Sequence, residues 1–196
     1  MSDLAHEIAA TAARLVVEEG LDYGAAKKRA VKTLGLPGRS ELPANELVED
    51  EVRAYIELFC ADTQPAELAA LRELAATWME RLAEFRPHLT GAVWRGTATR
   101  LNDIHLQLYC DDSKSAELAL IDRRVDYDVG STDGPRGEPV DVLTLASTSP
   151  ALGQRVLVHL TILDHDDLRG ALKPDARGRP WRGDLQALRA LMQAQR

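Results

Sequence analysis

The spacing of apolar residues changes at Arg86–Pro87, and this change constrains the fold more than any other feature of the chain. Before that point, apolar side chains recur every three to four residues, which is the period of an amphipathic helix. After it, they alternate with polar side chains, as in strands that bury one face. We therefore predict an α+β protein with a helical region at 1–85 and a mixed, mostly antiparallel sheet region at 86–196.

The first region is predicted to contain four helices, at 3–19, 23–34, 45–61 and 63–85. Asp22 is well placed to cap the second helix, and the Gly- and Pro-rich segment 35–43 predicts a loop. The second helix carries the densest basic cluster of the chain, which consists of Lys27, Lys28, Arg29 and Lys32. Such a cluster suits either an RNA, DNA or acidic-protein contact, or a solvated face near the negative end of the helix dipole.

The second region is predicted to contain strands at 103–110, 116–121, 124–129, 139–145 and 155–163. The first of these alternates cleanly between apolar and polar residues, which predicts one buried face. Segment 130–138 is rich in Gly, Pro, Ser and Asp and predicts a hairpin loop. A short helical segment at 164–172 and a final helix capped by Asp184 complete this region.

Composition argues against several classes of protein. The net charge of −7 disfavours broad, sequence-independent binding of nucleic acid. Cys60 and Cys110 lie far apart without metal-ligand spacing, so a reducing compartment is expected. The N-terminus lacks the basic region and the uninterrupted apolar core of a signal peptide, and no run is long enough to span a bilayer. We expect a cytoplasmic protein with no membrane partner.

Segment 91–112 contains the pattern most suggestive of chemistry. Four residues of a turn precede its strand, namely Gly91, Ala92, Arg95 and Gly96. Asp103 then opens the strand, and His105 lies two residues later, so both side chains project from the same face. Paired side chains at the start of a strand, facing a glycine turn, can hold a divalent metal against a phosphate.

This pattern resembles the nucleotidyltransferases of the DNA polymerase beta superfamily, especially their small bacterial "minimal" type. Members of that family carry Gly-Ser, then often Arg-Gly, then a strand with Asp-x-Asp. The residues that match here are Gly91, Arg95, Gly96 and Asp103. Ala92 replaces the family's Ser, and His105 replaces its second Asp. The resemblance is close over 91–112 and extends, by strand order, over about 86–165.

The resemblance implies a site for a nucleotide and a divalent metal. Its catalytic carboxylates would be Asp103 and, from the second strand of a hairpin, Asp141, with Asp128 as the alternative to Asp141. A metal, Mg or Mn, would be held by Asp103, His105 and Asp141. A nucleoside triphosphate would contact the turn residues Gly91, Ala92, Arg95 and Gly96.

The two departures from the family pattern, Ala92 and His105, occupy positions that in the family contact the phosphates or the metal. Magnesium prefers oxygen ligands to imidazole, so His105 suits manganese, zinc or iron better. We therefore expect a nucleotidyltransferase-like protein that binds a nucleotide or a divalent metal, with catalysis lost or altered. The alternatives are active nucleotidyl transfer to a protein, RNA or small-molecule hydroxyl, and a non-enzymatic protein-interaction module.

Three further features bear on function, and the first two have two interpretations each. Segment 164–167, Asp-His-Asp-Asp, is either a ligand set or the cap of a following helix. Loop 177–182 gathers three arginines, including Arg182, around Trp181, and either contacts a base or phosphate or forms a surface loop against the last helix. His159 alternates within an apolar strand and is expected to be a hydrogen-bonded core histidine.

Overall fold

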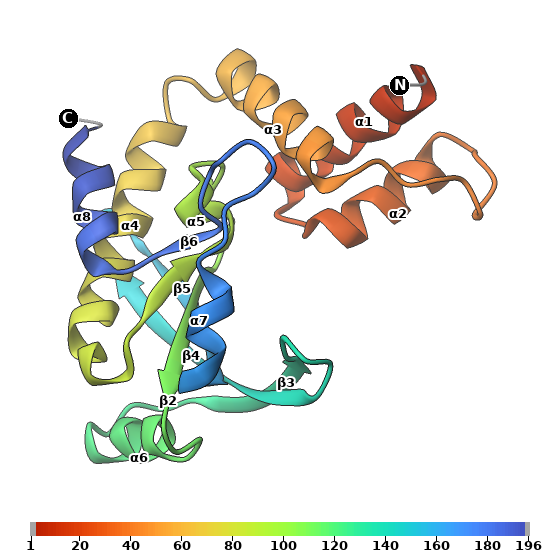
Figure 1. Cartoon of the computed structure of the whole chain (residues 1–196). Helices are drawn as coiled ribbons and strands as arrows, with labels where there is room; N and C mark the ends of the chain where they lie inside the picture. Colours follow the sequence, from red (N-terminus) through yellow and green to blue (C-terminus); the bar gives the residue numbers. More distant parts are fainter. Residues whose placement is uncertain (1–2, 195–196) are drawn as a thin grey trace. The chain divides into compact units, whose positions relative to one another are not determined.

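The computed structural model describes residues 3–194 and confirms the α+β class (Figure 1). The chain divides into two compact units. The first contains the described residues up to Glu67 together with Thr97–Leu101, and the second contains Leu68–Gly96 and the described residues from Asn102 onward. The division falls inside the helix Gln64–Arg81.

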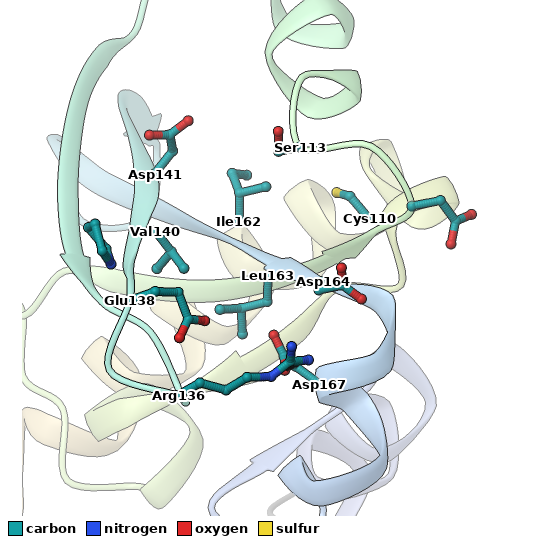
Figure 2. Close-up of a pocket in the computed structure, with 12 residues that line it drawn as sticks. Cys110, Ser113, Arg136, Glu138, Val140, Asp141, Ile162, Leu163, Asp164 and Asp167 are labelled. Carbon is teal, nitrogen blue, oxygen red and sulfur yellow. Dashed lines mark hydrogen bonds and ion pairs between the residues drawn. The ribbon is translucent and has the colours of Figure 1, made fainter.

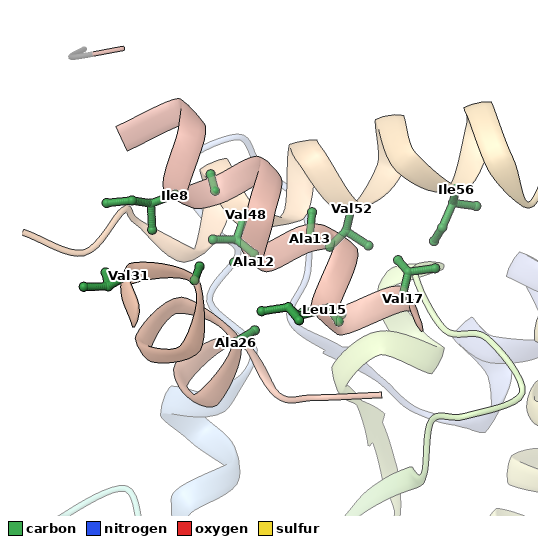
Figure 3. Packing of buried hydrophobic residues seen from close by; sticks show 13 residues of the cluster. Ile8, Ala12, Ala13, Leu15, Val17, Ala26, Val31, Val48, Val52 and Ile56 are labelled. Carbon is green, nitrogen blue, oxygen red and sulfur yellow. The ribbon is translucent and has the colours of Figure 1, made fainter. Parts of the chain in front are cut away.

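The first unit consists mainly of three helices, α1 (Asp3–Glu19), α2 (Tyr23–Thr33) and α3 (Asn45–Phe59). Asp22 caps α2 as predicted, since its carboxylate accepts a hydrogen bond from the Ala25 amide at 2.8 Å. Apolar residues at helical spacing, such as Ile8, Ala12 and Val48, form one buried core between the helices (Figure 3). Small side chains in this core let the helices approach closely.

The basic cluster of α2 is partly engaged within this unit. Lys27 Nζ donates to the Pro43 carbonyl at 3.0 Å and to Asn45 Oδ1 at 2.9 Å. Arg29 pairs with Glu19 at 2.6 Å. Two of the four cations therefore hold the loop before α3 and the end of α1.

The second unit is built on a six-stranded sheet with the order β3-β4-β5-β2-β1-β6. The strands are β1 (His88–Thr90), β2 (Ile104–Cys110), β3 (Asp128–Asp133), β4 (Pro139–Ser149), β5 (Gln154–Asp164) and β6 (Arg182–Gly183). The central pair, β2 and β5, is parallel, and the other pairs are antiparallel. The predicted mixed, mostly antiparallel sheet is therefore confirmed.

One face of the sheet is covered by α4 (Gln64–Arg81) and α8 (Leu185–Ala194). Trp78 of α4 donates its indole N–H to Ser147 Oγ of β4 at 2.9 Å. An ion pair between Glu80 and Arg189 joins α4 to α8. On β2, the residues facing this layer, including Leu106, are fully buried. The opposite face carries the polar residues described below and is called the open face.

The remaining short elements are η1 (Ala83–Phe85), α5 (Gly91–Arg95), α6 (Ser115–Asp122), η2 (His165–Asp167) and α7 (Leu168–Ala171). Asp184 caps α8 as predicted, accepting from the Ala187 amide at 2.9 Å. None of the helices formed by residues 3–194 is long and apolar enough to cross a membrane.

Two predicted strands were wrong in type or position. Segment 116–121 forms α6 and not a strand, because Ala116, Ala119 and Leu120 bury one helical face at i, i+3 and i+4. The strand predicted at 124–129 lies instead at Asp128–Asp133, where pairing with β4 sets its limits. The hairpin loop shortens accordingly to a turn around Gly134–Gly137.

Candidate functional site

A single row of residues crosses the open face from one edge of the sheet to the other. The strand registers place them, from β6 to β3, as Arg182, Thr90, His105, His159, Thr144 and Asp128. Residues in register on neighbouring strands project from the same face of a sheet. The predicted site residue His105 therefore lies in the middle of this cross-strand row, between the glycine turn after β1 and a second histidine on β5.

Asp103 joins the row through His159. Asp103 Oδ2 lies 3.0 Å from His159 Nε2, and Thr144 Oγ1 lies 2.9 Å from His159 Nδ1. The His105 ring stacks on the His159 ring, with centroids 4.8 Å apart and planes inclined by 20°. The structure thus brings together the predicted Asp103 and His105, and it adds His159, which sequence reasoning treated as a core residue.

The environment of His105 favours its neutral form. The residue is exposed on one side, and the ring of His159 covers one face of its imidazole. This desolvation lowers the pKa of His105 below its usual 6.5, and repulsion from His159 lowers it further, while Asp103 opposes the shift. His105 is therefore uncharged at neutral pH and has a proton-accepting nitrogen.

A cavity of about 800 Å³ lies over this part of the open face. Its floor includes His105, Gln107 and Tyr109 of β2, and Thr90, Gly91 and Arg182 form part of its wall. The β3–β4 turn and α7 enclose the remainder. Asp103 and His159 are not among the lining residues and support the site from beside His105.

Gly91 brings the turn after β1 against this strand. It adopts a φ of +71°, a left-handed conformation that glycine accepts more readily than other residues. A Cβ placed on Gly91 would lie 3.7 Å from Cδ2 of His105. The glycine turn adjoins β2 at His105, whereas Asp103, Ala92, Arg95 and Gly96 do not line the cavity.

Arg95 has a different role from the predicted phosphate contact. Its guanidinium is almost fully buried and pairs with Asp175 at 2.9 Å. The same group stacks over the ring of Trp181, 4.6 Å from the centroid. Arg95 thus anchors the loop that leads into β6, and Gly96 ends α5 with a φ of +81°. Arg95 and Gly96, which were predicted to contact a nucleotide, thus occupy positions that support the local fold.

Burial of Asp175 on its own would raise the pKa of its carboxyl. Hydrogen bonds from the amides of Arg177 and Arg179 and from Arg95 oppose that effect and hold the pKa at about 2. Asp175 is therefore charged throughout the neutral range and remains a partner for Arg95.

Asp141 is not brought to the predicted metal site. It lies three residues from Thr144 on β4, so its side chain leaves the opposite face of the strand. Its carboxylate is 3.4 Å from Lys114 Nζ, and it lines a neighbouring cavity of about 550 Å³ (Figure 2). The alternative carboxylate, Asp128, does lie in the cross-strand row but is two strands away from His159.

The residues present do not fit the paired magnesium ions that the resemblance implied. Asp103 is the carboxylate beside the two histidines, and its Oδ2 is engaged with His159. The adjacent positions hold imidazoles, whereas magnesium requires mainly oxygen ligands. Within residues 3–194, no three His, Cys, Asp or Glu side chains are arranged to hold a metal ion. The predicted set of Asp103, His105 and Asp141 is therefore not assembled.

The acidic segment 164–167 serves the local fold. Asp164 caps η2, accepting from the Asp166 amide at 2.8 Å. Asp167 pairs with Arg136 of the β3–β4 turn at 2.7 Å, as the close-up of the neighbouring cavity shows (Figure 2). Of the two interpretations, the structure supports helix capping.

Sequence reasoning missed His159, Gln107, Tyr109 and Thr144 as residues of this site. Alternation placed Gln107 and Tyr109 on the same face as His105, but it did not indicate which strands are neighbours. The parallel pairing of β2 with β5 supplies that information. Comparison with protein-family models, curated proteins and solved structures finds no match to this chain.

Proposed function

We propose that this chain binds a nucleotide in the cavity on the open face, as a nucleotidyltransferase-like protein with an altered site. The observation that carries the proposal is the contact between the Gly91 turn and His105, both of which line that cavity. In the family that the sequence resembles, the glycine turn and the start of the following strand together surround the nucleotide phosphates. The same two elements adjoin here through the register of Thr90 with His105.

The size of the cavity supports the same ligand class. Pockets for small molecules and cofactors generally enclose about 300–1,000 Å³, and about 800 Å³ is sufficient for a nucleotide. Gln107 supplies a polar group on its floor, and Arg182 supplies a positive charge. The absence of a side chain at Gly91 leaves the backbone accessible to a phosphate.

A second candidate is transfer of a nucleoside monophosphate from a nucleoside triphosphate to an acceptor hydroxyl, in which the bond between the α- and β-phosphates breaks and pyrophosphate leaves. It is favoured by the neutral imidazole of His105, which lies in the cavity and has a lowered pKa. A group of that kind can remove a proton from an attacking hydroxyl. Both ring nitrogens of His159 face protein partners, so His159 acts in this scheme by positioning His105 through the stacked rings.

Binding is tested by titrating the purified chain with ATP, GTP, CTP and UTP in a calorimeter. We expect at least one nucleotide to bind the wild type and to bind His105→Ala more weakly, because that variant removes part of the cavity floor. His6→Ala is the matched control, since His6 is exposed on α1. If the chain bound none of the four nucleotides, the proposal would be wrong.

Transfer is tested with α-³²P-labelled nucleotides and candidate acceptors that carry hydroxyl groups. We expect label transfer to require both Asp103 and His105, and to fail in Asp103→Ala and His105→Ala while His6→Ala remains active. Nucleotide binding without any label transfer would reject nucleotidyl transfer and leave the proposed binding function unaffected.

A further inference from the structure

Arg182 is held rigidly at the wall of the cavity by two residues of β2. Its Nη1 donates to Gln107 Oε1 at 2.6 Å and to the Tyr109 hydroxyl at 3.3 Å. The Tyr109 hydroxyl donates in turn to Gln107 Oε1 at 3.1 Å. Tyr109 is completely buried, and its ring packs edge-on against His88. The guanidinium is thus oriented before any ligand binds, which reduces the entropy lost on binding.

The guanidinium retains an unused donor. Arg182 Nε is buried and has no hydrogen-bond partner among residues 3–194. A buried polar group without a partner is unfavourable and calls for a ligand or a water molecule. The planar fork of an arginine matches the paired oxygens of a phosphate or a carboxylate.

The charges around the cavity are divided between the two edges of the sheet. Arg182 lies on β6 at one edge, and Asp133 lies at the end of β3 at the other. Arg136, the other arginine of the cavity, is neutralised by its ion pair with Asp167. No ion pair to Arg182 is formed within the described part of the chain. Asp166 adds a further carboxylate on the η2 side of the cavity, so the unpaired positive charge lies at the β6 edge, beside Thr90 and Gly91.

We propose that Arg182, oriented by Gln107 and Tyr109, forms the anion subsite of this cavity and binds an oxyanion group of the ligand. This inference rests on the proposed nucleotide binding when the oxyanion is a phosphate of that nucleotide. It assigns the phosphates to the β6 edge and directs the rest of the ligand toward the β3–β4 turn. The anchoring arginine is then Arg182, two strands from His105, and not Arg95 of the sequence motif.

The test is calorimetric titration of the full chain with four probes: ATP, adenosine, pyrophosphate and citrate. The main variant is Arg182→Gln, and Arg155→Gln is the matched control because Arg155 is exposed on β5 and does not line the cavity. We expect Arg182→Gln to weaken the binding of ATP and of pyrophosphate by about tenfold or more, since it removes a charge-assisted contact. Adenosine, which lacks an anionic group, should bind both proteins equally.

A second variant keeps the test informative if Arg182→Gln fails to fold. Gln107→Glu is nearly isosteric and places a carboxylate where the Gln107 oxygen accepts from Arg182 at 2.6 Å. The new ion pair should preserve the fold while neutralising the subsite, so this variant should also bind ATP and pyrophosphate about tenfold more weakly.

The outcomes separate this inference from the proposed function. ATP that binds wild type, Arg182→Gln and Gln107→Glu equally would overturn the anion subsite and leave nucleotide binding intact. Pyrophosphate or citrate that binds through Arg182, without any nucleotide binding, would support the subsite and reject the nucleotide. Binding of citrate in preference to pyrophosphate would identify the oxyanion as a carboxylate. A wild-type chain that binds none of the probes would overturn both proposals.

Discussion

His105 and His159 stack face to face on adjacent parallel strands, with their ring centroids 4.8 Å apart. The pair is bordered by Asp103, whose carboxylate lies 3.0 Å from His159 Nε2, and by Thr144 on the far side of His159. Two imidazoles this close cannot both carry a charge without strong repulsion. The arrangement therefore couples protonation of the site to the stability of the sheet that supports it.

The first prediction concerns the acid sensitivity that His105 confers. Because its pKa is lowered in the folded chain, the unfolded chain binds a proton below about pH 6.5 that the folded chain does not bind. The free energy of unfolding should therefore fall as the pH decreases from about 7.5 to about 5.5. His105→Asn should lose less stability over that range in urea denaturation.

The control for this measurement is His6→Asn, which removes an exposed histidine of the helical unit. Its pH dependence should follow that of the wild type. Equal pH dependence in wild type and His105→Asn would contradict the lowered pKa of His105.

The second prediction concerns the backbone of Gly91. A side chain at its φ of +71° is strained, so Gly91→Ala should lower the free energy of unfolding by about 1 kcal/mol. Gly170→Ala is a suitable control in the same unit, because a Cβ there meets nothing within 4 Å and the backbone is not left-handed. Chemical denaturation of both variants measures the difference. If the two variants were equally stable, Gly91 would not be required by its conformation.

Local patterns allowed much of this architecture to be predicted from the sequence. Alternation identified β2 and β5, and helical spacing with a capping Asp22 identified α1 and α2. The same spacing was present in α6, but a short apolar run fits a strand or a helix until its neighbours are known. Its buried Ala116, Ala119 and Leu120 resolve the ambiguity.

Only part of the candidate site could be predicted from the sequence, because the site depends on which strands become neighbours. Asp103 and His105 share a face by simple alternation, and the structure places them together. His159 reaches them through a parallel pairing that no local pattern specifies. Arg95 matched a family motif, yet its partner Asp175 lies 80 residues away. Buried partners of this kind decide whether a charged side chain is available to a ligand.

The third prediction concerns the Arg95–Asp175 ion pair. The carboxyl of Asp175 has a pKa of about 2 in the folded chain, against a usual 3.8, so the pair adds stability above about pH 3.8. That contribution should disappear as the pH falls toward about 2. Asp175→Asn should be less stable than the wild type at neutral pH, because it leaves Arg95 buried without a counter-charge.

Acid denaturation measured by circular dichroism tests this expectation. The wild type should lose stability more steeply than Asp175→Asn between about pH 4 and about pH 2. Arg155→Gln, which removes an exposed arginine from β5, should behave as the wild type. Parallel acid titrations of wild type and Asp175→Asn would show that the ion pair is not a source of stability.

The last prediction concerns the close approach of β6 to α5. A Cβ on Gly183 would lie 2.1 Å from Cη2 of Trp94, which is far inside van der Waals contact. The indole has little freedom to move away, since its Nε1 donates to the Pro180 carbonyl at 2.9 Å. Gly183→Ala should therefore cost about 1–3 kcal/mol of unfolding free energy, as overpacked cores do.

A double-mutant cycle with Trp94→Leu separates this clash from other effects. The smaller side chain leaves room for a Cβ, so Gly183→Ala should cost much less in the Trp94→Leu background than in the wild type. An equal cost in both backgrounds would place the effect in the backbone of β6 and not in contact with Trp94. Because Arg182 precedes Gly183, a displaced β6 should also weaken anion binding in Gly183→Ala, and pyrophosphate titration of that variant measures how closely the anion subsite depends on this packing.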